Sequence, residues 1–189
     1  MSRLTDRPKQ RYAFYSAFLF GERKMIEPEP FRIYLMRHAQ AASATPGGRD
    51  FDRVLDDRGY AQAEMVADRA ADLGYVPDCI VSSTATRCRQ TAEIVRRAVG
   101  ETLDIQFVDE IYSGTPDLYA TIIAGQRPAH SVMLIGHNPS IDQLLEGLIG
   151  KEQRRTAMPG GYPTAGLAVL DYSTGTDVGA WTLTNLLSV

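Results

Sequence analysis

The sequence has 189 residues, of which 44% are hydrophobic and 23% are charged, and its net charge is −3. This size and composition predict a globular domain with a sizeable core. The acidic balance argues against a general nucleic-acid-binding protein, whose domain normally carries a basic face. The two cysteines, Cys79 and Cys88, form neither a disulfide framework nor a metal-site spacing, so we expect them to pack in the interior of a protein from a reducing compartment.

Residues 1–28 differ in composition from the rest of the chain. Four basic residues precede an aromatic-rich apolar run at 12–20, and Pro28 and Pro30 follow it. We expect this segment to be an N-terminal extension, helical or disordered, and residues 29–189 to form the main domain. No apolar run approaches the roughly 20 residues that cross a bilayer. The sequence therefore predicts a cytoplasmic protein without membrane contact, either a monomer or a weak dimer.

From residue 31 onward, short apolar runs alternate with segments of helical periodicity. The predicted strands cover residues 33–36, 79–82, 105–108, 131–135, 166–171 and 178–186. The predicted helices start after Asp56, after Ser83 or Thr84, at Pro116, and after a cap at Asn138. Repeated strand–helix pairs predict a three-layer α/β/α sandwich with a mostly parallel central sheet, and the last two strands predict an antiparallel edge.

Residues suited to anion binding follow three of these strands. Arg37 and His38 come after the first strand, Arg87 after the second and His137 after the fourth. Because ligands of open α/β sheets lie outside the carboxyl ends of the strands, we expect one crevice to hold these side chains. A guanidinium offers a charged, planar fork of donors that suits phosphate oxygens. The sequence thus predicts a phosphate site, with His38 as nucleophile and Arg37 as part of the clamp.

Three segments resemble motifs of the histidine phosphatase superfamily, which has the phosphoglycerate mutase-like fold. Residues 35–39 are similar to its Arg-His-Gly signature, residues 83–92 to its second arginine motif, and residues 135–138 to its second histidine motif. Residues 53–59 and 163–166 resemble segments of the short phosphohistidine phosphatases called SixA, and the compact length is similar to that branch. The resemblance covers residues 31–171, with the three motifs in the family's order.

This resemblance implies a role for each matching residue. His38 would accept the phosphoryl group and form a phosphohistidine intermediate. Arg37, Arg87 and Arg53 would bind the phosphoryl oxygens, and His137 would add a donor against charge that develops during transfer. These groups would act without a metal or a cofactor.

The sequence departs from the family pattern at one position and leaves a second one open. Ala39 stands where the family has glycine, which adds a methyl group beside the nucleophile. Glu110 lies in a segment that resembles the part of mutase relatives holding an acidic proton donor. Glu110 is therefore the candidate donor, and the alternative is a solvated carboxylate just past a strand.

Three functions follow as hypotheses. The first is a phosphatase that acts on phosphohistidine in a protein partner, such as a histidine phosphotransfer domain. It is favoured because a short chain leaves the pocket open to a side chain from another protein. The second is a small-molecule phosphomonoesterase or mutase of the same superfamily, with a phosphorylated metabolite as substrate. The third is a non-catalytic module that senses phosphate.

Overall fold

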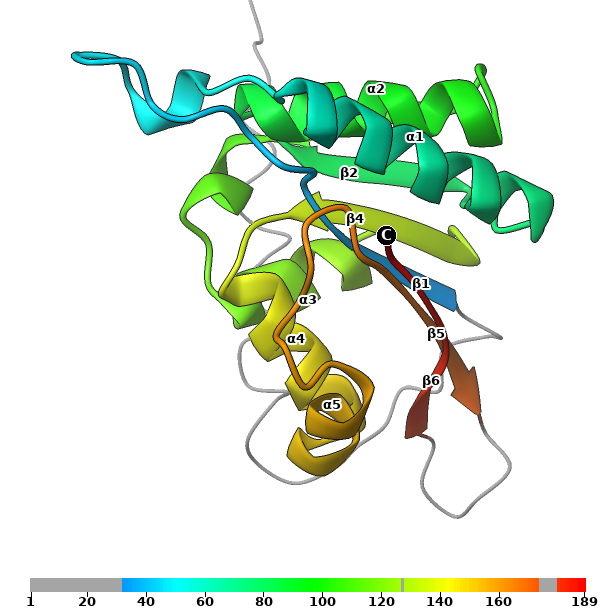
Figure 1. Cartoon of the computed structure of the whole chain (residues 1–189). Coiled ribbons are helices and arrows are strands. Elements are labelled where there is room, and N and C mark those ends of the chain that lie inside the picture. The colour runs from blue at the N-terminus through cyan, green and yellow to red at the C-terminus, as the bar shows by residue number, and fades with distance from the viewer. Residues whose placement is uncertain (1–31, 127, 174–179) are drawn as a thin grey trace, which may run out of the picture.

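The computed structural model describes residues 32–126, 128–173 and 180–189. The predicted N-terminal extension and its boundary with the main domain lie outside these residues, as does the start of the last predicted strand. Within the described ranges, the chain forms a six-stranded mixed sheet with helices on both of its faces (Figure 1). The predicted α/β class, with a phosphoglycerate mutase-like arrangement, is confirmed.

The sheet has the strand order β3-β2-β4-β1-β5-β6. Its strands are β1 (Arg32–Arg37), β2 (Cys79–Ser83), β3 (Ile105–Val108), β4 (Ser131–Gly136), β5 (Leu167–Ser173) and β6 (Ala180–Leu187). The first four strands pair in parallel, and β5 and β6 pair antiparallel at one edge. The central strands are apolar along nearly their whole length because both faces of the sheet are covered. The predicted antiparallel edge is therefore confirmed.

Two helical layers enclose the sheet. On one face lie α1 (Asp57–Asp72) and α2 (Thr86–Val99), and on the other lie α3 (Pro116–Ala124), α4 (Ser140–Ile149) and α5 (Lys151–Ala157) (Figure 1). Each face has its own core of buried apolar side chains. Alternate residues of one strand enter different cores, as the two-residue period of a strand requires. Met36 packs in the core beneath α1 and α2, and Leu35 packs in the core beneath α3 and α4.

The caps of the helices agree with the sequence in part. Asp56 caps α1, and its carboxylate accepts a hydrogen bond from the Gly59 amide at 2.7 Å. The predicted cap at Asn138 is wrong, because α4 begins at Ser140 and Pro139 occupies the cap position without a side-chain bond. The predicted cap of α2 at Ser83 or Thr84 is also wrong. That helix begins at Thr86, and the Ser83 hydroxyl lies 2.9 Å from a ring nitrogen of His137 instead.

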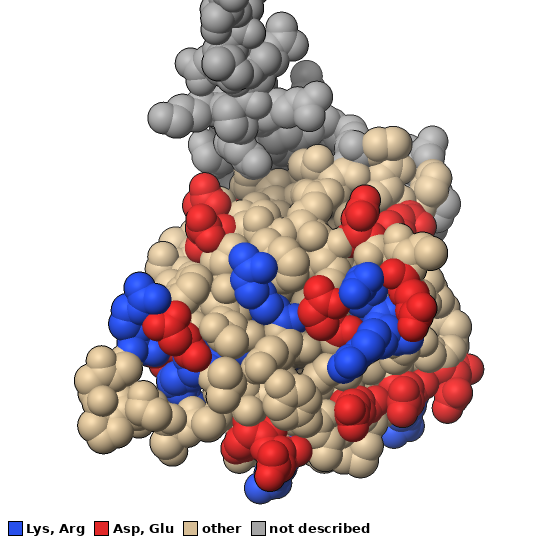
Figure 2. All heavy atoms as spheres, turned by 90° about the horizontal axis from the view of Figure 1, so that it is seen from above, with Lys and Arg blue, Asp and Glu red and all other residues tan. Residues whose placement is uncertain are grey.

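The described surface bears on the predicted absence of nucleic-acid and membrane partners. Figure 2 views the molecule from the side of α1 and α2, and acidic and basic side chains are intermingled on that face. Of the helices in the described ranges, none is long and apolar enough to span a bilayer.

Candidate active site

The sheet brings the predicted site residues to one edge. In the parallel pair β1–β4, Arg37 is level with Gly136, so His38 and His137 leave neighbouring strands at the same height. Strand β2 pairs with the other side of β4 and ends at Ser83, four residues before Arg87. Gly136 has a close neighbour, because a Cβ at this position would lie 2.8 Å from the Tyr119 ring. The strand pairing therefore brings His38, His137 and the segment before Arg87 to one edge of the sheet, at the carboxyl ends of the strands.

His38 is oriented by the backbone of the next residue, Ala39. Its Nδ1 lies 2.8 Å from the Ala39 carbonyl oxygen, which can only accept, so Nδ1 carries the proton and Nε2 keeps a lone pair. Burial, with further contributions from nearby arginines, lowers the pKa of His38 to about 4. The imidazole is therefore neutral at physiological pH, as a nucleophile must be.

Ala39 fits this turn without strain. Its side chain is fully buried in the core beneath α1 and α2, and its amide donates to the Thr91 hydroxyl at 3.2 Å. Among the described residues other than glycine, positive φ occurs at Ala165 and not at Ala39. The position therefore does not require the conformational freedom of glycine.

Arg87 contacts three other residues of the site. It is 6% exposed, and its Nε donates to the lone pair of His38 Nε2 at 3.3 Å. One terminal nitrogen, Nη2, lies 3.3 Å from His137 Nδ1 and 3.0 Å from a carboxylate oxygen of Asp50. The other terminal nitrogen donates to the Asp50 carbonyl oxygen at 2.7 Å. One guanidinium thus joins the nucleophile, the second histidine and an acidic residue.

His137 is buried and neutral. Its ring centroid lies 5.2 Å from that of His38. Because Arg87 can only donate, Nδ1 of His137 accepts, and its Nε2 proton points to the Ser83 hydroxyl at 2.9 Å. Burial and the neighbouring His38 lower the pKa of His137 to about 3. To donate to a phosphoryl group, as predicted, this ring would have to exchange one of these partners.

Arg37 and Arg53 have different surroundings. Arg37 donates to the Tyr162 carbonyl oxygen at 2.7 Å, and its buried Nε has no partner among the described residues. A buried donor without a partner is costly, so this nitrogen is suited to a ligand oxygen. Arg53 donates to the Ala42 carbonyl oxygen at 2.7 Å and to the Asp50 carboxylate at 2.9 Å. Both of these bonds tie Arg53 to residues 42–50.

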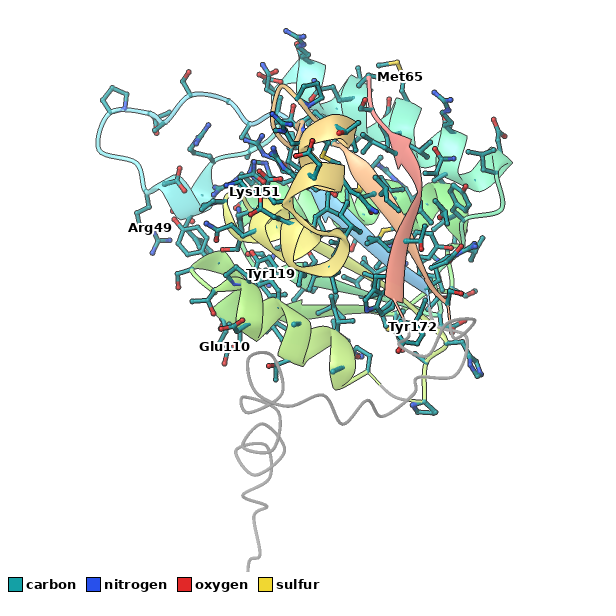
Figure 3. All side chains as sticks on the ribbon, turned by 90° about the horizontal axis from the view of Figure 1, so that it is seen from below. Arg49, Met65, Glu110, Tyr119, Lys151 and Tyr172 are labelled. Atoms are coloured by element: carbon teal, nitrogen blue, oxygen red, sulfur yellow. The ribbon has the colours of Figure 1, made fainter. Side chains whose placement is uncertain are left out.

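Glu110 lies on the short helix η2 (Asp109–Tyr112) and is exposed. Figure 3 shows it at the surface of the molecule. Residues two apart on a 3₁₀ helix point in different directions, and from this helix it is Tyr112 that reaches the site, with its ring edge-on to His137 at 5.5 Å. The role of Glu110 as proton donor stays a prediction.

Sequence reasoning did not find Asp50, Tyr112 or Cys88 as members of the site. Asp50 belongs to the short helix η1 (Asp50–Asp52), within a polar loop. Its spacing of three residues from Arg53 was the available signal, because such a pair can meet in a turn. Cys88, which we expected to pack, is fully buried in the core, and its Sγ lies 3.5 Å from His137 Nε2.

The donor set of the site is suited to an anion. The guanidinium groups of Arg53 and Arg87 both hold the Asp50 carboxylate, and Arg87 also contacts the two neutral imidazoles. In the parts of the chain that the structure describes, no group of three or more His, Cys, Asp or Glu side chains is arranged to hold a metal ion. What these residues can do chemically is bind a phosphoryl group and present a nucleophilic nitrogen to it.

Comparison with known proteins places this site in a family. The family model of the histidine phosphatase superfamily (branch 1) matches residues 33–112. A solved SixA structure from Agrobacterium tumefaciens is 47% identical, with a TM-score of 0.79, and the match covers 85% of this chain and 99% of that one. The chain belongs to the histidine phosphatase superfamily, in its SixA-type branch.

Further relatives extend this likeness. The structure of the protein histidine phosphatase SixA complexed with tungstate shares the fold, with a TM-score of 0.66 and 21% identity over 84% of this chain and 97% of that one. A chloroplastic protein from Arabidopsis thaliana is 30% identical over 63% of this chain, and the mitochondrial serine/threonine-protein phosphatase PGAM5 from Xenopus laevis is 43% identical over 34% of it. The chain spans 59% and 23% of the lengths of these two relatives.

Proposed function

We propose that this protein is a metal-independent phosphatase that removes the phosphoryl group from phosphohistidine in a protein partner, through a phosphohistidine intermediate on His38. The observation that carries the proposal is the orientation of His38. Its Nδ1 proton points to the Ala39 carbonyl oxygen, and its Nε2 lone pair faces the donors of Arg87. Superfamily membership supports a phosphatase.

The reaction would proceed in two transfers. The Nε2 lone pair of His38 is released from the Arg87 Nε proton and attacks phosphorus, a new N–P bond forms, and the bond between phosphorus and the substrate imidazole breaks. The departing imidazole nitrogen takes a proton from solvent, and the attacking water of the second step returns one. Water then attacks the phosphoryl group on His38, which releases orthophosphate and restores the lone pair. Arg37 and Arg87 supply charge against the equatorial oxygens, since phosphoryl transfer depends mainly on positioning and electrostatics.

The choice of a protein substrate has separate support. The similar SixA structure solved with tungstate is named a protein histidine phosphatase. An imidazole leaving group also needs less help from a general acid than an alkoxide does, which suits a site whose candidate donor, Glu110, is exposed at the surface. The partner would then be a phosphorylated histidine phosphotransfer domain or a protein like it.

A phosphate ester is the second candidate substrate. The match to PGAM5, which is named a serine/threonine-protein phosphatase, favours it. In this case Glu110 would have to supply the proton to an alkoxide, so E110Q would reduce turnover strongly. With a phosphohistidine substrate, E110Q should change turnover less than threefold.

A substrate panel tests the proposal. Purified protein is assayed with a phosphohistidine protein, with a phosphoserine peptide and with sugar phosphates, beside H38A as the inactive control. We expect rapid turnover of the phosphohistidine protein by the wild type alone. Turnover confined to esters would select the second candidate, and orthophosphate binding without any turnover would indicate a sensing module.

A further inference from the structure

Two of the arginines predicted to bind phosphate already bind an anion in the structure, the side chain of Asp50. The Asp50 carboxylate accepts from Arg87 Nη2 at 3.0 Å, from Arg53 Nη1 at 2.9 Å and from the Tyr112 hydroxyl at 3.0 Å. The Asp50 backbone carbonyl accepts a further bond from Arg87 at 2.7 Å. Two of the three arginines predicted to bind phosphate are thus occupied by one residue.

The loop that carries Asp50 is anchored at its base. Ala41 and Leu55 pair across it in an isolated antiparallel bridge, and the Ala42 amide donates to the Val54 carbonyl oxygen at 2.9 Å. The Leu55 amide is held by the Gln90 side chain of α2 at 2.7 Å. Asp50 therefore reaches Arg87 from the end of a closed loop, and its side chain remains 50% exposed to solvent.

Phe51, the residue after Asp50, makes a second contact with the site. The Phe51 ring packs edge-on against the Tyr112 ring at 5.1 Å, and Tyr112 in turn lies against His137 and beneath the guanidinium of Arg87. The segment Asp50–Phe51 thus touches the site through a charge and through an aromatic ring. Neither contact is part of the bridge at the base of the loop.

We propose that Asp50 competes with the phosphoryl group for Arg87 and Arg53. Asp50 binds these two arginines when no phosphoryl group is present, and it is displaced from them when a phosphoryl group enters the site. Four of the five N–H donors of Arg87 are engaged by described residues, so a phosphoryl group can bind two of these donors at once only by taking the place of an existing partner. A carboxylate and a phosphoryl dianion on the same guanidinium repel each other. His38 must keep its place for attack, and His137 is neutral and buried, whereas Asp50 is half exposed and carries the like charge. Asp50 is therefore the group that gives way.

This inference rests on the proposed function, because it takes the clamp to be a phosphoryl site. The consequence is a site that releases orthophosphate readily, since the carboxylate returns as the product leaves. A different role for Asp50 predicts the opposite effect of its removal on phosphate affinity. If Asp50 served to hold Arg87 in place for phosphate, removal of its charge would weaken phosphate binding.

The test measures orthophosphate binding by calorimetry in the whole protein, with D50N against D52N. Asp52 is a matched control, because it lies on the same short helix and pairs with the exposed Arg49 rather than with Arg87. We expect D50N to lower the Kd for orthophosphate about tenfold, because both the internal ion pairs and the repulsion are removed. D52N should change it less than twofold.

A Kd for D50N that is unchanged or higher than that of the wild type would overturn the proposal, as would an equal effect of D52N. D50A serves as the second variant, with thermal unfolding as a check on folding, and it should tighten binding in the same way. Because the probe is orthophosphate, the result does not depend on turnover. If D50N binds orthophosphate more tightly but the wild type does not hydrolyse phosphohistidine, the proposed function is refuted and the role of Asp50 stands.

Discussion

At the scale of single residues, the protonation of each histidine ring is set by a neighbour that can only donate or only accept a hydrogen bond. The Ala39 carbonyl sets the tautomer of His38, and the guanidinium of Arg87 sets that of His137. Arg87 therefore does more than supply charge, because it orients the second histidine and lies against the lone pair of the first.

Arg87 gives the residue-scale prediction. R87K keeps a positive charge but loses the planar fork, so it cannot contact His38, His137 and Asp50 at once. We expect kcat/KM for the phosphohistidine protein to fall by about 10²- to 10³-fold. R96K is the matched control on α2, because Arg96 pairs with Glu93 in the last turns of that helix, and it should retain full activity.

An R87K enzyme with more than a tenth of wild-type kcat/KM would contradict the assigned role of the fork. The positions of Arg37, His38, Arg87 and His137 could be predicted because each lies at or shortly after the end of a buried strand. Asp50 and Tyr112 could not, since the path of a polar loop and the direction of a short 3₁₀ helix leave no periodic pattern in the sequence.

At the scale of elements, the site depends on how closely α1 approaches the segment after β1. A Cβ on Gly59 would lie 1.9 Å from the Gln40 carbonyl oxygen, which is backbone and cannot move aside easily. The same carbonyl accepts from the Asp56 amide at 3.2 Å. The start of α1 is thus fixed against the chain that leads from His38 into the Asp50 loop.

Two glycine-to-alanine variants form the element-scale prediction. G59A should lower the free energy of unfolding by more than about 2 kcal/mol, because the methyl group forces backbone apart. In G147A the new Cβ meets open space within α4, so the higher helix propensity of alanine should raise stability by about 0.5–1 kcal/mol. Urea unfolding of both variants measures the difference, and equal stabilities would contradict the close packing at Gly59.

The elements show where sequence patterns are informative. Helices α1 and α2 have apolar residues at helical spacing, and Asp56 marks the start of α1, whereas α2 begins after Ala85 without a side-chain cap. Helix α5 was missed because Lys151–Ala157 is almost entirely polar and buries none of its residues. Such a helix has no apolar face for periodicity to reveal.

At the scale of the whole molecule, two neutral histidines, His137 buried and His38 partly buried, make stability depend on pH. The pKa of His38 is lowered to about 4 and that of His137 to about 3, from an ordinary value of 6.5. The unfolded chain therefore binds protons first as the pH falls. The stability contributed by the neutral rings is fully present above pH 6.5 and is lost progressively below it.

The expected loss is about 1.4 kcal/mol per pH unit for each histidine. Between pH 7 and pH 5 the free energy of unfolding should therefore decrease by on the order of 3 kcal/mol, measured by urea unfolding in a buffer without phosphate. H38Q should reduce this dependence by about half. Stability that is flat or rises toward pH 5 would show that the histidines are not buried as neutral groups.

The fold class could be predicted from the alternation of strands and helices, because each apolar run must be covered on both faces of a parallel sheet. The strand order β3-β2-β4-β1-β5-β6 could not, because an apolar run does not indicate which strand lies beside it. The convergence of His38, Arg87 and His137 depends on that order, with β1 and β2 on either side of β4.

The most direct test of the central claim is to trap the phosphoryl group on the enzyme. The protein is mixed for milliseconds with a radiolabelled phosphohistidine protein, quenched in alkali, where phosphohistidine survives, and digested for mass spectrometry. The account predicts label on the peptide that contains His38, lost on acid treatment and absent from H38A. Turnover without label at His38, or unchanged turnover by H38A, would contradict it.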